Sequence, residues 1–223
     1  MLVSPHVRQH RSLLAAQEKR LLIWIAERLP FWLNSDHLSA LGLLSMAGAG
    51  LAFAYSPWNP SVGLPMVIVF LALNWFGDSL DGTVARVRNQ QRPRYGFYVD
   101  HVIDLAGTAC LFGGLAASGF MSPLVAALVV AGFFLVSAES FLATHVRGIF
   151  NMSFGGVGPT ELRLLIAAGA LTLLNGPFVE VPVIGQLRLF DLGGIIGTVG
   201  MVVAFIATSS VNVRALYLEE TRR

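Results

Sequence analysis

Six long apolar runs dominate this sequence and constrain its fold more than any other feature. A helix rises about 1.5 Å per residue, so about 20 apolar residues are needed to cross the ~30 Å hydrocarbon core of a bilayer. The runs cover approximately residues 37–56, 63–86, 95–118, 123–146, 159–175 and 191–215. The sequence therefore predicts an all-α, polytopic membrane protein with six transmembrane helices.

Composition supports a bilayer environment and argues against several other classes of protein. Hydrophobic residues make up 55% of the chain and charged residues only 13%, which is about half the charged share of an ordinary globular domain. The formal net charge of +2 is too small to indicate binding to nucleic acid. The single cysteine, Cys110, leaves no disulfide within one chain and disfavours a thiolate metal site.

The N-terminal segment has a different pattern from the apolar runs. Across residues 12–29, leucine and isoleucine recur on one helical stripe with charged side chains away from it, and Pro30 ends the pattern. We therefore expect an amphipathic helix that lies on the membrane surface. The predicted organisation is a juxtamembrane segment at residues 1–36, followed by a six-helix transmembrane domain at residues 37–223.

Lysine and arginine residues are distributed unevenly along the chain. Of the 15 present, 14 fall before the first span, at the even-numbered connections or after the last span, and Arg188 is the exception. Because cytoplasmic loops collect Lys and Arg, both termini and the even-numbered connections are predicted to face the cytoplasm. The same distribution predicts an even number of spans.

Four aspartates flank the connection between the second and third spans. Asp78 and Asp81 are three positions apart, and Asp100 and Asp104 are four apart, so each pair occupies one face of its helix. The short connection makes the two helices antiparallel neighbours, with axes about 8 to 10 Å apart. We therefore expect the two pairs to converge at the cytoplasmic ends of these spans.

Four carboxylates in or beside apolar helices repel one another unless positive charge is supplied. Oxygen ligands without a neighbouring cysteine favour a hard cation, which predicts one or two Mg²⁺ ions, with Mn²⁺ able to substitute and Ca²⁺ as a further candidate. The alternative interpretations are an ion-pair network with the nearby arginines, or a cation or proton pathway. A transporter usually carries such residues near the membrane midplane and in repeated halves, whereas these lie at one end of one hairpin.

Small and cationic residues accompany the acidic pair on the second span. Gly82 and Ala85 would let a flat or phosphorylated ligand approach the helix backbone, and Arg86 could hold a phosphate. Close packing against another helix is the alternative interpretation of the two small residues. Together with the four aspartates, they favour a site for a phosphorylated ligand.

These residues form one motif over residues 78–104, which reads Asp-x2-Asp-Gly-x2-Ala-Arg, nine residues, Gly-x3-Asp-x3-Asp. It resembles the signature of the CDP-alcohol phosphotransferases at every fixed position. Upstream, residues 35–42 are similar to the Pro-Asn-x-Leu/Ile-Thr-x-x-Gly segment that begins the first span in this family. Here Ser35, Asp36 and Ser39 replace the family's Pro, Asn and Thr.

The resemblance implies a six-helix membrane enzyme of phospholipid biosynthesis, usually a homodimer, that displaces CMP from a CDP-linked alcohol. By position, it implies that Asp78, Asp81 and Asp100 are metal ligands. Asp104 would be the catalytic base and would also assist at the metal site. The other motif residues would contact the nucleotide and its phosphates or give them room, and these are Gly82, Ala85, Arg86 and Gly96.

The sequence leaves the substrate pair open within this class of enzyme. We expect CDP-diacylglycerol as the donor and a phosphorylated polyol, such as inositol phosphate or glycerol phosphate, as the acceptor. Arg147, Arg163 and Arg214 belong to different spans but share the predicted cytoplasmic level of the aspartates, where guanidinium groups could hold the acceptor's phosphate. The tendency of arginine to collect on the cytoplasmic side explains these positions equally well.

Three alternatives to this function remain. Residues 24–32, with two tryptophans, are somewhat similar to a segment of the amino-alcohol branch of the family, in which CDP-choline or CDP-ethanolamine is the donor and a lipid alcohol the acceptor. A non-catalytic membrane scaffold would explain the hydropathy alone, and a cation transporter would also use carboxylates within the membrane.

Overall fold

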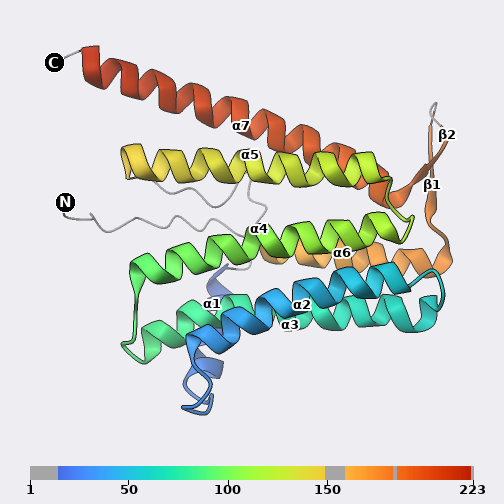
Figure 1. The fold of residues 1–223 in the computed structure, drawn as a ribbon, viewed down its shortest axis with the longest axis horizontal. Helices are drawn as coiled ribbons and strands as arrows, with labels where there is room; N and C mark the ends of the chain where they lie inside the picture. Colours follow the sequence, from blue (N-terminus) through green and yellow to red (C-terminus); the bar gives the residue numbers. More distant parts are fainter. Residues whose placement is uncertain (1–14, 149–158, 183–184, 222–223) are drawn as a thin grey trace.

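The computed structural model describes residues 15–148, 159–182 and 185–221, and most of them belong to long helices that lie side by side (Figure 1). In chain order, the elements are α1 (Ala15–Ala26), α2 (Ser35–Tyr55), α3 (Pro60–Val87), α4 (Pro93–Ala117), α5 (Pro123–Arg147), α6 (Pro159–Thr172), the 3-10 turn η1 (Leu173–Asn175), β1 (Phe178–Val181), β2 (Gly185–Arg188) and α7 (Leu189–Thr221). The helical membrane-protein fold predicted from the sequence is confirmed.

The ends of the long helices follow from local sequence signals. Proline stands in the first turn of α3, α4 and α5, where its missing N–H removes no helical hydrogen bond. At the start of α2, the Asn34 side chain accepts a hydrogen bond from the backbone N–H of His37 at 3.0 Å, which forms half of a capping box. α5 ends at Gly148, whose φ of 68° is the left-handed conformation that glycine adopts without strain.

The backbones of α2, α3 and α4 lie unusually close together. A Cβ atom on Gly114 of α4 would stand 2.0 Å from the carbonyl oxygen of Gly50 in α2, and a Cβ atom on Gly77 of α3 would stand 2.5 Å from that of Leu38. Only glycine allows this approach, because any side chain would have to displace backbone. The main apolar core, which includes Phe53, lies toward the end of the bundle opposite the α3–α4 connection.

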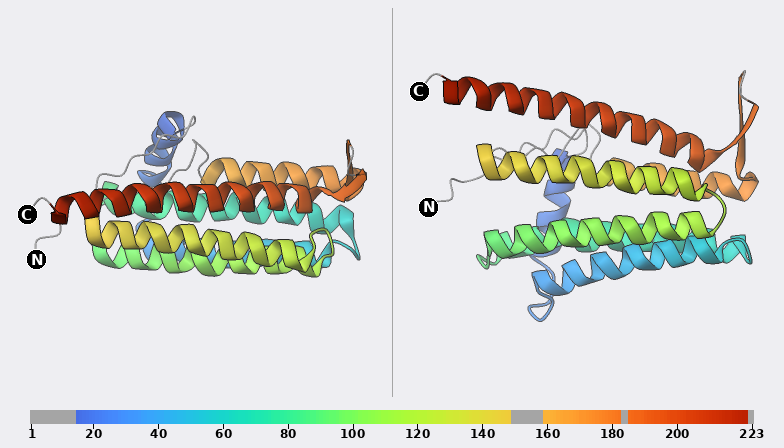
Figure 2. Two further views of the ribbon diagram at one scale, coloured as in Figure 1. Left: turned by 90° about the horizontal axis from the view of Figure 1, so that it is seen from above. Right: turned by 45° about the horizontal axis from the view of Figure 1, so that its top comes forward.

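Helix α1 runs across the long helices (Figure 2). Leu22 and Ala26 are buried and pack in one cluster with Leu80 and Val84 of α3, whereas Trp24 on the other face is 54% exposed. The amphipathic helix expected at residues 12–29 is therefore present, although residues 12–14 lie outside the described part. Its location on the membrane surface, and the division of the chain at residue 36, stay predictions.

Within the described residues, five helices are long and apolar enough to cross a membrane, namely α2, α3, α4, α5 and α7. They correspond to five of the six predicted spans. The remaining prediction, residues 159–175, falls on α6 and η1, where the α-helix has 14 residues. A helix of that length rises only about 21 Å, so the count of six spans stays a prediction.

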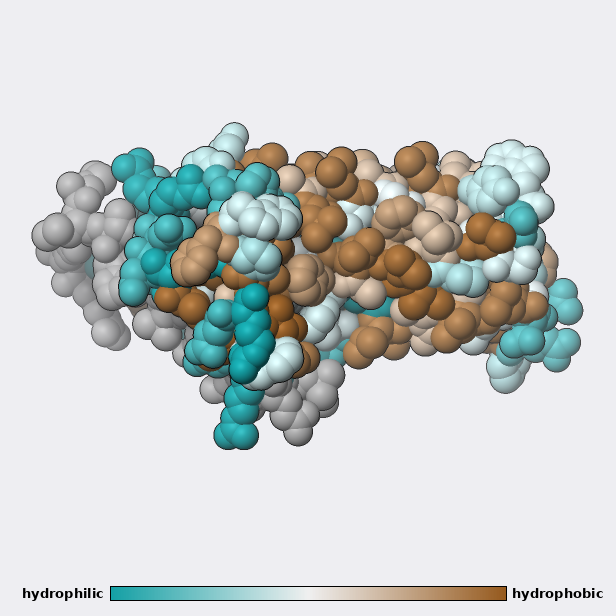
Figure 3. All heavy atoms as spheres, turned by 90° about the horizontal axis from the view of Figure 1, so that it is seen from below, coloured by the Kyte–Doolittle hydropathy of each residue, from teal (hydrophilic) through white to brown (hydrophobic). Residues whose placement is uncertain are grey.

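The surface agrees with a membrane environment. Figure 3 shows a broad apolar band over the long helices, with hydrophilic residues gathered toward the two ends. On α7, for example, Ile196 is 64% exposed and Val203 61%. A soluble monomer rarely exposes a contiguous apolar surface of this extent, whereas lipid chains cover it in a bilayer. The chain is thus an integral, multi-pass membrane protein.

A small antiparallel β-hairpin between α6 and α7 was not predicted from the sequence. β1 and β2 pair with Phe178 opposite Arg188 and Val181 opposite Gly185. The hairpin lies at the end of the bundle away from the α3–α4 connection (Figure 1). Strands of four residues are too short for a two-residue hydrophobic period to distinguish them from a loop.

Candidate active site

Three of the four predicted aspartates meet where α3 ends and α4 begins. Asp78, Asp100 and Asp104 each offer one carboxylate oxygen, and these oxygens all lie within 4.8 Å of one another. Each of the three residues is partly buried. Oxygens at this separation can share one hard cation, because Mg²⁺ and Ca²⁺ bind oxygen at about 2.0 to 2.6 Å.

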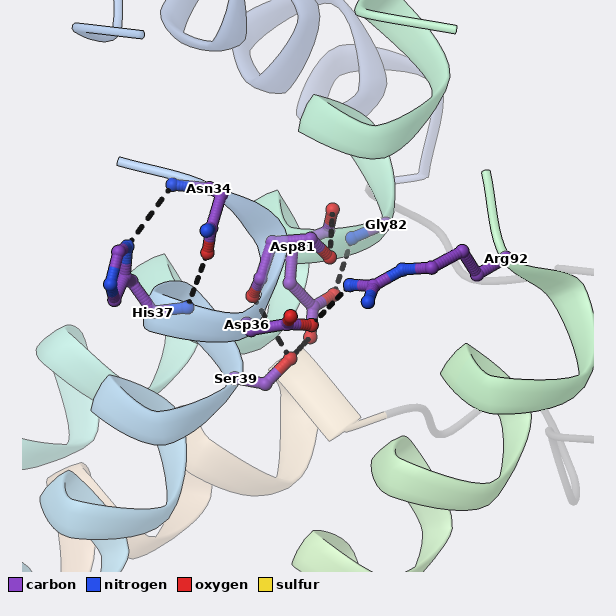
Figure 4. A network of polar contacts seen from close by, with 8 residues as sticks. Asn34, Asp36, His37, Ser39, Asp81, Gly82 and Arg92 are labelled. Atoms are coloured by element: carbon purple, nitrogen blue, oxygen red, sulfur yellow. Dashed lines mark hydrogen bonds and ion pairs between the residues drawn. The ribbon is translucent and has the colours of Figure 1, made fainter. Parts of the chain in front are cut away.

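Asp81 lies beside this group but is held by groups of α2 and of its own helix (Figure 4). Ser39 Oγ donates a hydrogen bond to Asp81 Oδ2 at 2.6 Å, and the backbone N–H of Gly82 donates to Oδ1. Ser35 Oγ also donates to the backbone oxygen of Asp81 at 3.0 Å. Ser39 therefore keeps the hydroxyl of the threonine that the family has at this position, and this hydroxyl orients an aspartate of the motif.

A cation from α6 contacts the aspartate group directly. Arg163 Nη2 donates to Asp78 Oδ2, and Arg163 Nε donates to Asn74 Oδ1 at 2.7 Å. The side chains of Arg163 and Asp78 are only 14% and 23% exposed. Among the three arginines predicted to hold the acceptor, Arg163 is thus the one that contacts the aspartates.

The other two predicted arginines have different surroundings. Arg147 Nη1 donates to Asn212 Oδ1 at 2.5 Å, and Asn212 Nδ2 donates to Glu139 Oε1 at 2.5 Å, so this chain of contacts joins α5 to α7. A cavity of about 270 Å³ between these two helices is lined by all three residues. Arg214, on α7, is exposed.

Of the motif residues expected to bind the nucleotide, Arg86 and Gly96 are exposed, and Gly82 and Ala85 are partly buried. Arg86 is exposed, and its Nη2 donates to Thr83 Oγ1 at 2.9 Å. A Cβ atom on Gly82 would lie 3.2 Å from Arg86 Nη1, which places the guanidinium beside Gly82, while Ala85 is partly buried. A Cβ atom on Gly96 would meet no atom within 4 Å, so Gly96 borders open space.

The start of α2 is tied to the connection between α3 and α4 (Figure 4). Arg92 Nη2 donates to Asp36 Oδ1 at 2.5 Å, and this hydrogen bond raises the pKa of the Arg92 guanidinium. The same guanidinium lies 4.3 Å from the centre of the Tyr95 ring. Asp36 stands where the family has asparagine, and Arg92 neutralises the added charge.

Two residues that hold the predicted arginines, Asn74 and Asn212, were not predicted from the sequence. Asn74 did carry a signal, because it is a polar residue within an apolar run and lies one helical turn before Asp78 on the same face. Asn212 carried no comparable signal, because no motif residue lies on its helix.

The helical fold and the aspartate site indicate the kind of protein to which this chain belongs. It is a multi-pass helical membrane protein with a cluster of carboxylates at one end of the bundle, beside a partly buried arginine, in an arrangement that can hold a divalent cation and a phosphorylated ligand.

Comparison with known proteins identifies the family. The sequence model of the CDP-alcohol phosphatidyltransferase family matches residues 36–209, which is most of the chain. The chain belongs to this family and is a transferase of substituted phosphate groups. The family resemblance inferred from the motif is therefore confirmed.

Comparison of structures supports the same fold. The chain is similar to the crystal structure of the Mycobacterium tuberculosis phosphatidylinositol phosphate synthase PgsA1 with CDP-DAG bound, with a TM-score of 0.63 and 18% sequence identity. The alignment covers 86% of this chain and 94% of that one. A search of curated protein sequences found no match.

Proposed function

We propose that this chain transfers the phosphatidyl group of CDP-diacylglycerol to a hydroxyl of a phosphorylated polyol and releases CMP. The observation that carries the proposal is the convergence of Asp78, Asp100 and Asp104 within 4.8 Å on the family's motif. CDP-diacylglycerol as the donor is supported by the shared fold with a synthase that has this compound bound.

The donor set of the cluster fits a hard divalent cation, since it consists of carboxylate oxygens. Asp78 and Asp100 of the cluster and the neighbouring Asp81 would be the metal ligands, and Asp104 would assist. Mg²⁺ would be the natural ion, and Mn²⁺ could substitute for it. One or two such ions, when bound, neutralise charge on the pyrophosphate and make CMP a better leaving group. Ser39 supports this role because its hydrogen bond orients the Asp81 carboxylate.

Asp104 would act as the general base. Its carboxylate accepts the proton of the acceptor hydroxyl, and the acceptor oxygen forms a bond to the phosphorus that carries the diacylglycerol. The bond from that phosphorus to the oxygen of CMP breaks, and CMP leaves with the electron pair. Atoms and charge balance without an oxidant, a reductant or a covalent intermediate on the protein.

The nucleotide half of the donor would lie along the exposed part of the motif. The Arg86 side chain is exposed and donates to the Thr83 hydroxyl one turn away, and rotation about its side-chain bonds would bring the guanidinium to a phosphate of the donor. Gly82 and Ala85 limit the bulk of α3 beside it, and Gly96 borders open space at the start of α4.

The acceptor would be anionic and held by Arg147, Arg163 and Arg214. Arg163 supports this role because it places a fixed, permanently charged group against the aspartates, where the attacking hydroxyl must arrive. Arg147 lines a cavity of about 270 Å³ between α5 and α7. A neutral lipid alcohol has no negative charge that these guanidinium groups could bind.

The active site and both termini would face the cytoplasm. Arg188 of the β-hairpin lies at one end of the bundle, whereas the arginines of the α3–α4 connection lie at the other, beside the aspartates (Figure 1). Labelling of a C-terminal tag from the opposite side of sealed vesicles would overturn this orientation. A homodimer, which is usual in the family, stays a prediction.

The experiment that tests the function is a CMP-release assay with purified protein in lipid micelles. CDP-diacylglycerol and CDP-choline are each offered with inositol phosphate, glycerol phosphate or diacylglycerol. We expect turnover with CDP-diacylglycerol and one of the phosphorylated polyols. Turnover of CDP-choline with diacylglycerol would move the chain to the amino-alcohol branch. No CMP release from either donor, together with ion flux after reconstitution into sealed vesicles, would favour a transporter.

A further inference from the structure

Asn74 is a buried polar residue in the apolar part of α3, and both ends of its amide are bonded to other helices. Only 4% of the residue is exposed. Its Nδ2 donates to the carbonyl oxygen of Gly42 in α2 at 2.9 Å, and its Oδ1 accepts from Arg163 Nε in α6 at 2.7 Å. The amide orientation is fixed, because a guanidinium can only donate and a carbonyl oxygen can only accept.

Helix α2, which carries the Gly42 carbonyl group, packs in direct backbone contact with α3, which carries Asn74. A Cβ atom on Gly77, one turn from Asn74, would lie 2.5 Å from the Leu38 oxygen and 2.7 Å from the Gly42 nitrogen. The backbones of α2 and α3 therefore touch at the level of Asn74. The carbonyl group that receives the amide cannot move without separating the two helices.

The start of α6 is held at the same level by a second contact. Glu18 of α1 accepts hydrogen bonds from Trp75 Nε1 of α3 at 2.7 Å and from Thr160 Oγ1 of α6 at 3.0 Å. Arg163 follows Thr160 by three residues, so its helix is positioned independently of Asn74. The amide then has to position only the long side chain of Arg163.

This side chain is held at two points. Nε is bonded to Asn74, and Nη2 is bonded to Asp78, which itself belongs to the cluster of three aspartates. A guanidinium is planar, so two bonds from adjacent nitrogens fix both its position and its plane. Without the amide, Arg163 would have one partner in the site and several accessible side-chain conformations.

We propose that Asn74 is a positioning residue, which holds Arg163 beside the aspartate cluster so that its guanidinium meets the phosphate of the acceptor. This inference rests on the proposed role of Arg163 in acceptor binding. Asn74 itself touches neither substrate. A cation held here also repels a divalent metal ion from Asp78, so the same contact lowers the affinity of the cluster for metal.

The test compares Asn74→Leu with Arg163→Ala in two measurements on the full chain in detergent. Leucine has a similar volume but offers no acceptor for Arg163 Nε, so the guanidinium turns toward water. We expect both variants to bind Mn²⁺ more tightly, measured by electron paramagnetic resonance without substrate. We also expect both to raise the acceptor KM by about five- to tenfold, with the CDP-diacylglycerol KM within about twofold of the parent's.

Structural damage alone predicts a different result, because a distorted cluster would bind Mn²⁺ more weakly. Adding Asn74→Leu to Arg163→Ala should change the acceptor KM by less than about twofold, since the residue acts through Arg163. Ser56→Ala removes another buried polar group, directly after the end of α2 near the far end of the bundle, and should leave both measurements unchanged. Additive effects in the double variant, or weaker Mn²⁺ binding by Asn74→Leu, would overturn the proposal.

Asn74→Asp provides a second variant in case leucine prevents folding. Its carboxyl group has the shape of the amide: one oxygen accepts from Arg163 Nε, and the other, when protonated, donates to the Gly42 carbonyl oxygen, so the acceptor KM should stay within about twofold of the parent's. A rise to the value of Arg163→Ala would overturn the positioning role. If Arg163→Ala itself leaves the acceptor KM unchanged, Arg163 does not bind the acceptor and that part of the proposed function fails. The Mn²⁺ affinities of Asn74→Leu and Arg163→Ala still decide whether Asn74 positions Arg163.

Discussion

The two ends of the helical bundle are held together by different kinds of contact. At the end that carries the β-hairpin, the helices meet through buried apolar side chains such as Phe53, Leu115 and Phe190. They also meet through the close backbone contact between Gly50 and Gly114. Packing of this kind requires complementary shape but no charge.

At the other end, polar side chains make contacts between the helices. Ser39 of α2 binds Asp81 of α3, and Arg163 of α6 binds both Asp78 and Asn74. Polar groups within a membrane protein are costly unless they are paired, and they concentrate where function requires them. We therefore expect substitutions at the polar end to change activity more than stability. Substitutions at the apolar end should change stability more than activity.

The largest effect is expected from the aspartates of the polar end. Asp78→Asn, Asp81→Asn and Asp100→Asn should each abolish CMP release, because each removes one of the proposed metal ligands. The variants should stay folded, since each also removes repulsion between like charges. CMP release and thermal unfolding are measured together, and full turnover by the parent protein in excess chelator would contradict the metal assignment.

Asp104→Asn should have the next largest effect. Loss of a general base costs about 10² to 10⁴ in rate, so kcat should fall by that factor while binding of CDP-diacylglycerol is less affected. Single-turnover kinetics and a binding assay with the CDP-lipid separate the two quantities. Normal turnover by this variant would require another base, and Glu139 and His145 on α5 would be the next candidates.

Gly114→Ala tests the apolar end. The added Cβ would stand 2.0 Å from the Gly50 oxygen, so α2 and α4 must separate, and overpacking of this kind costs about 1 to 3 kcal/mol of unfolding free energy. We expect a lower Tm with kcat of the folded protein nearly unchanged. Gly113→Ala is the matched control, because a Cβ atom there meets nothing within 4 Å. Equal Tm values for the two variants would contradict the prediction that close packing at the apolar end determines stability.

The acceptor arginines should show moderate effects at the polar end. Arg147→Ala, Arg163→Ala and Arg214→Ala should each raise the acceptor KM, by up to about tenfold, and leave the donor KM nearly unchanged. Arg163→Ala should have the largest effect, since Arg163 contacts the cluster. Arg188→Ala, in the hairpin, serves as the control. Unchanged acceptor kinetics in all three variants would assign these positions to membrane topology alone.

The smallest effect is expected from Asp36→Asn, which restores the residue of the family pattern. The ion pair with Arg92 is about half exposed, and such pairs contribute little, so activity should stay within about twofold of the parent's. Steady-state CMP release measures this effect. A much larger loss would show that the charge of Asp36 takes part in the site.

Local features of the fold could be read from the sequence with good accuracy. The predicted spans at residues 37–56 and 123–146 coincide with α2 and α5 to within a few residues, because proline and capping signals act on adjacent positions. α6 was predicted to be longer, because hydropathy continues through η1 while the helix does not. The hairpin lay below the length at which a strand pattern is recognisable.

The apolar helices and the placement of each aspartate pair on one helical face could be predicted from the sequence alone, because length, hydropathy and residue spacing are local properties. The partners that complete the site became known only from the way the helices pack in three dimensions. Arg163 lies 85 positions from Asp78, and Ser39 lies 42 positions from Asp81. These contacts depend on how α6 and α2 pack against α3, and such packing depends on the shapes of all three helices at once rather than on any pattern along one of them.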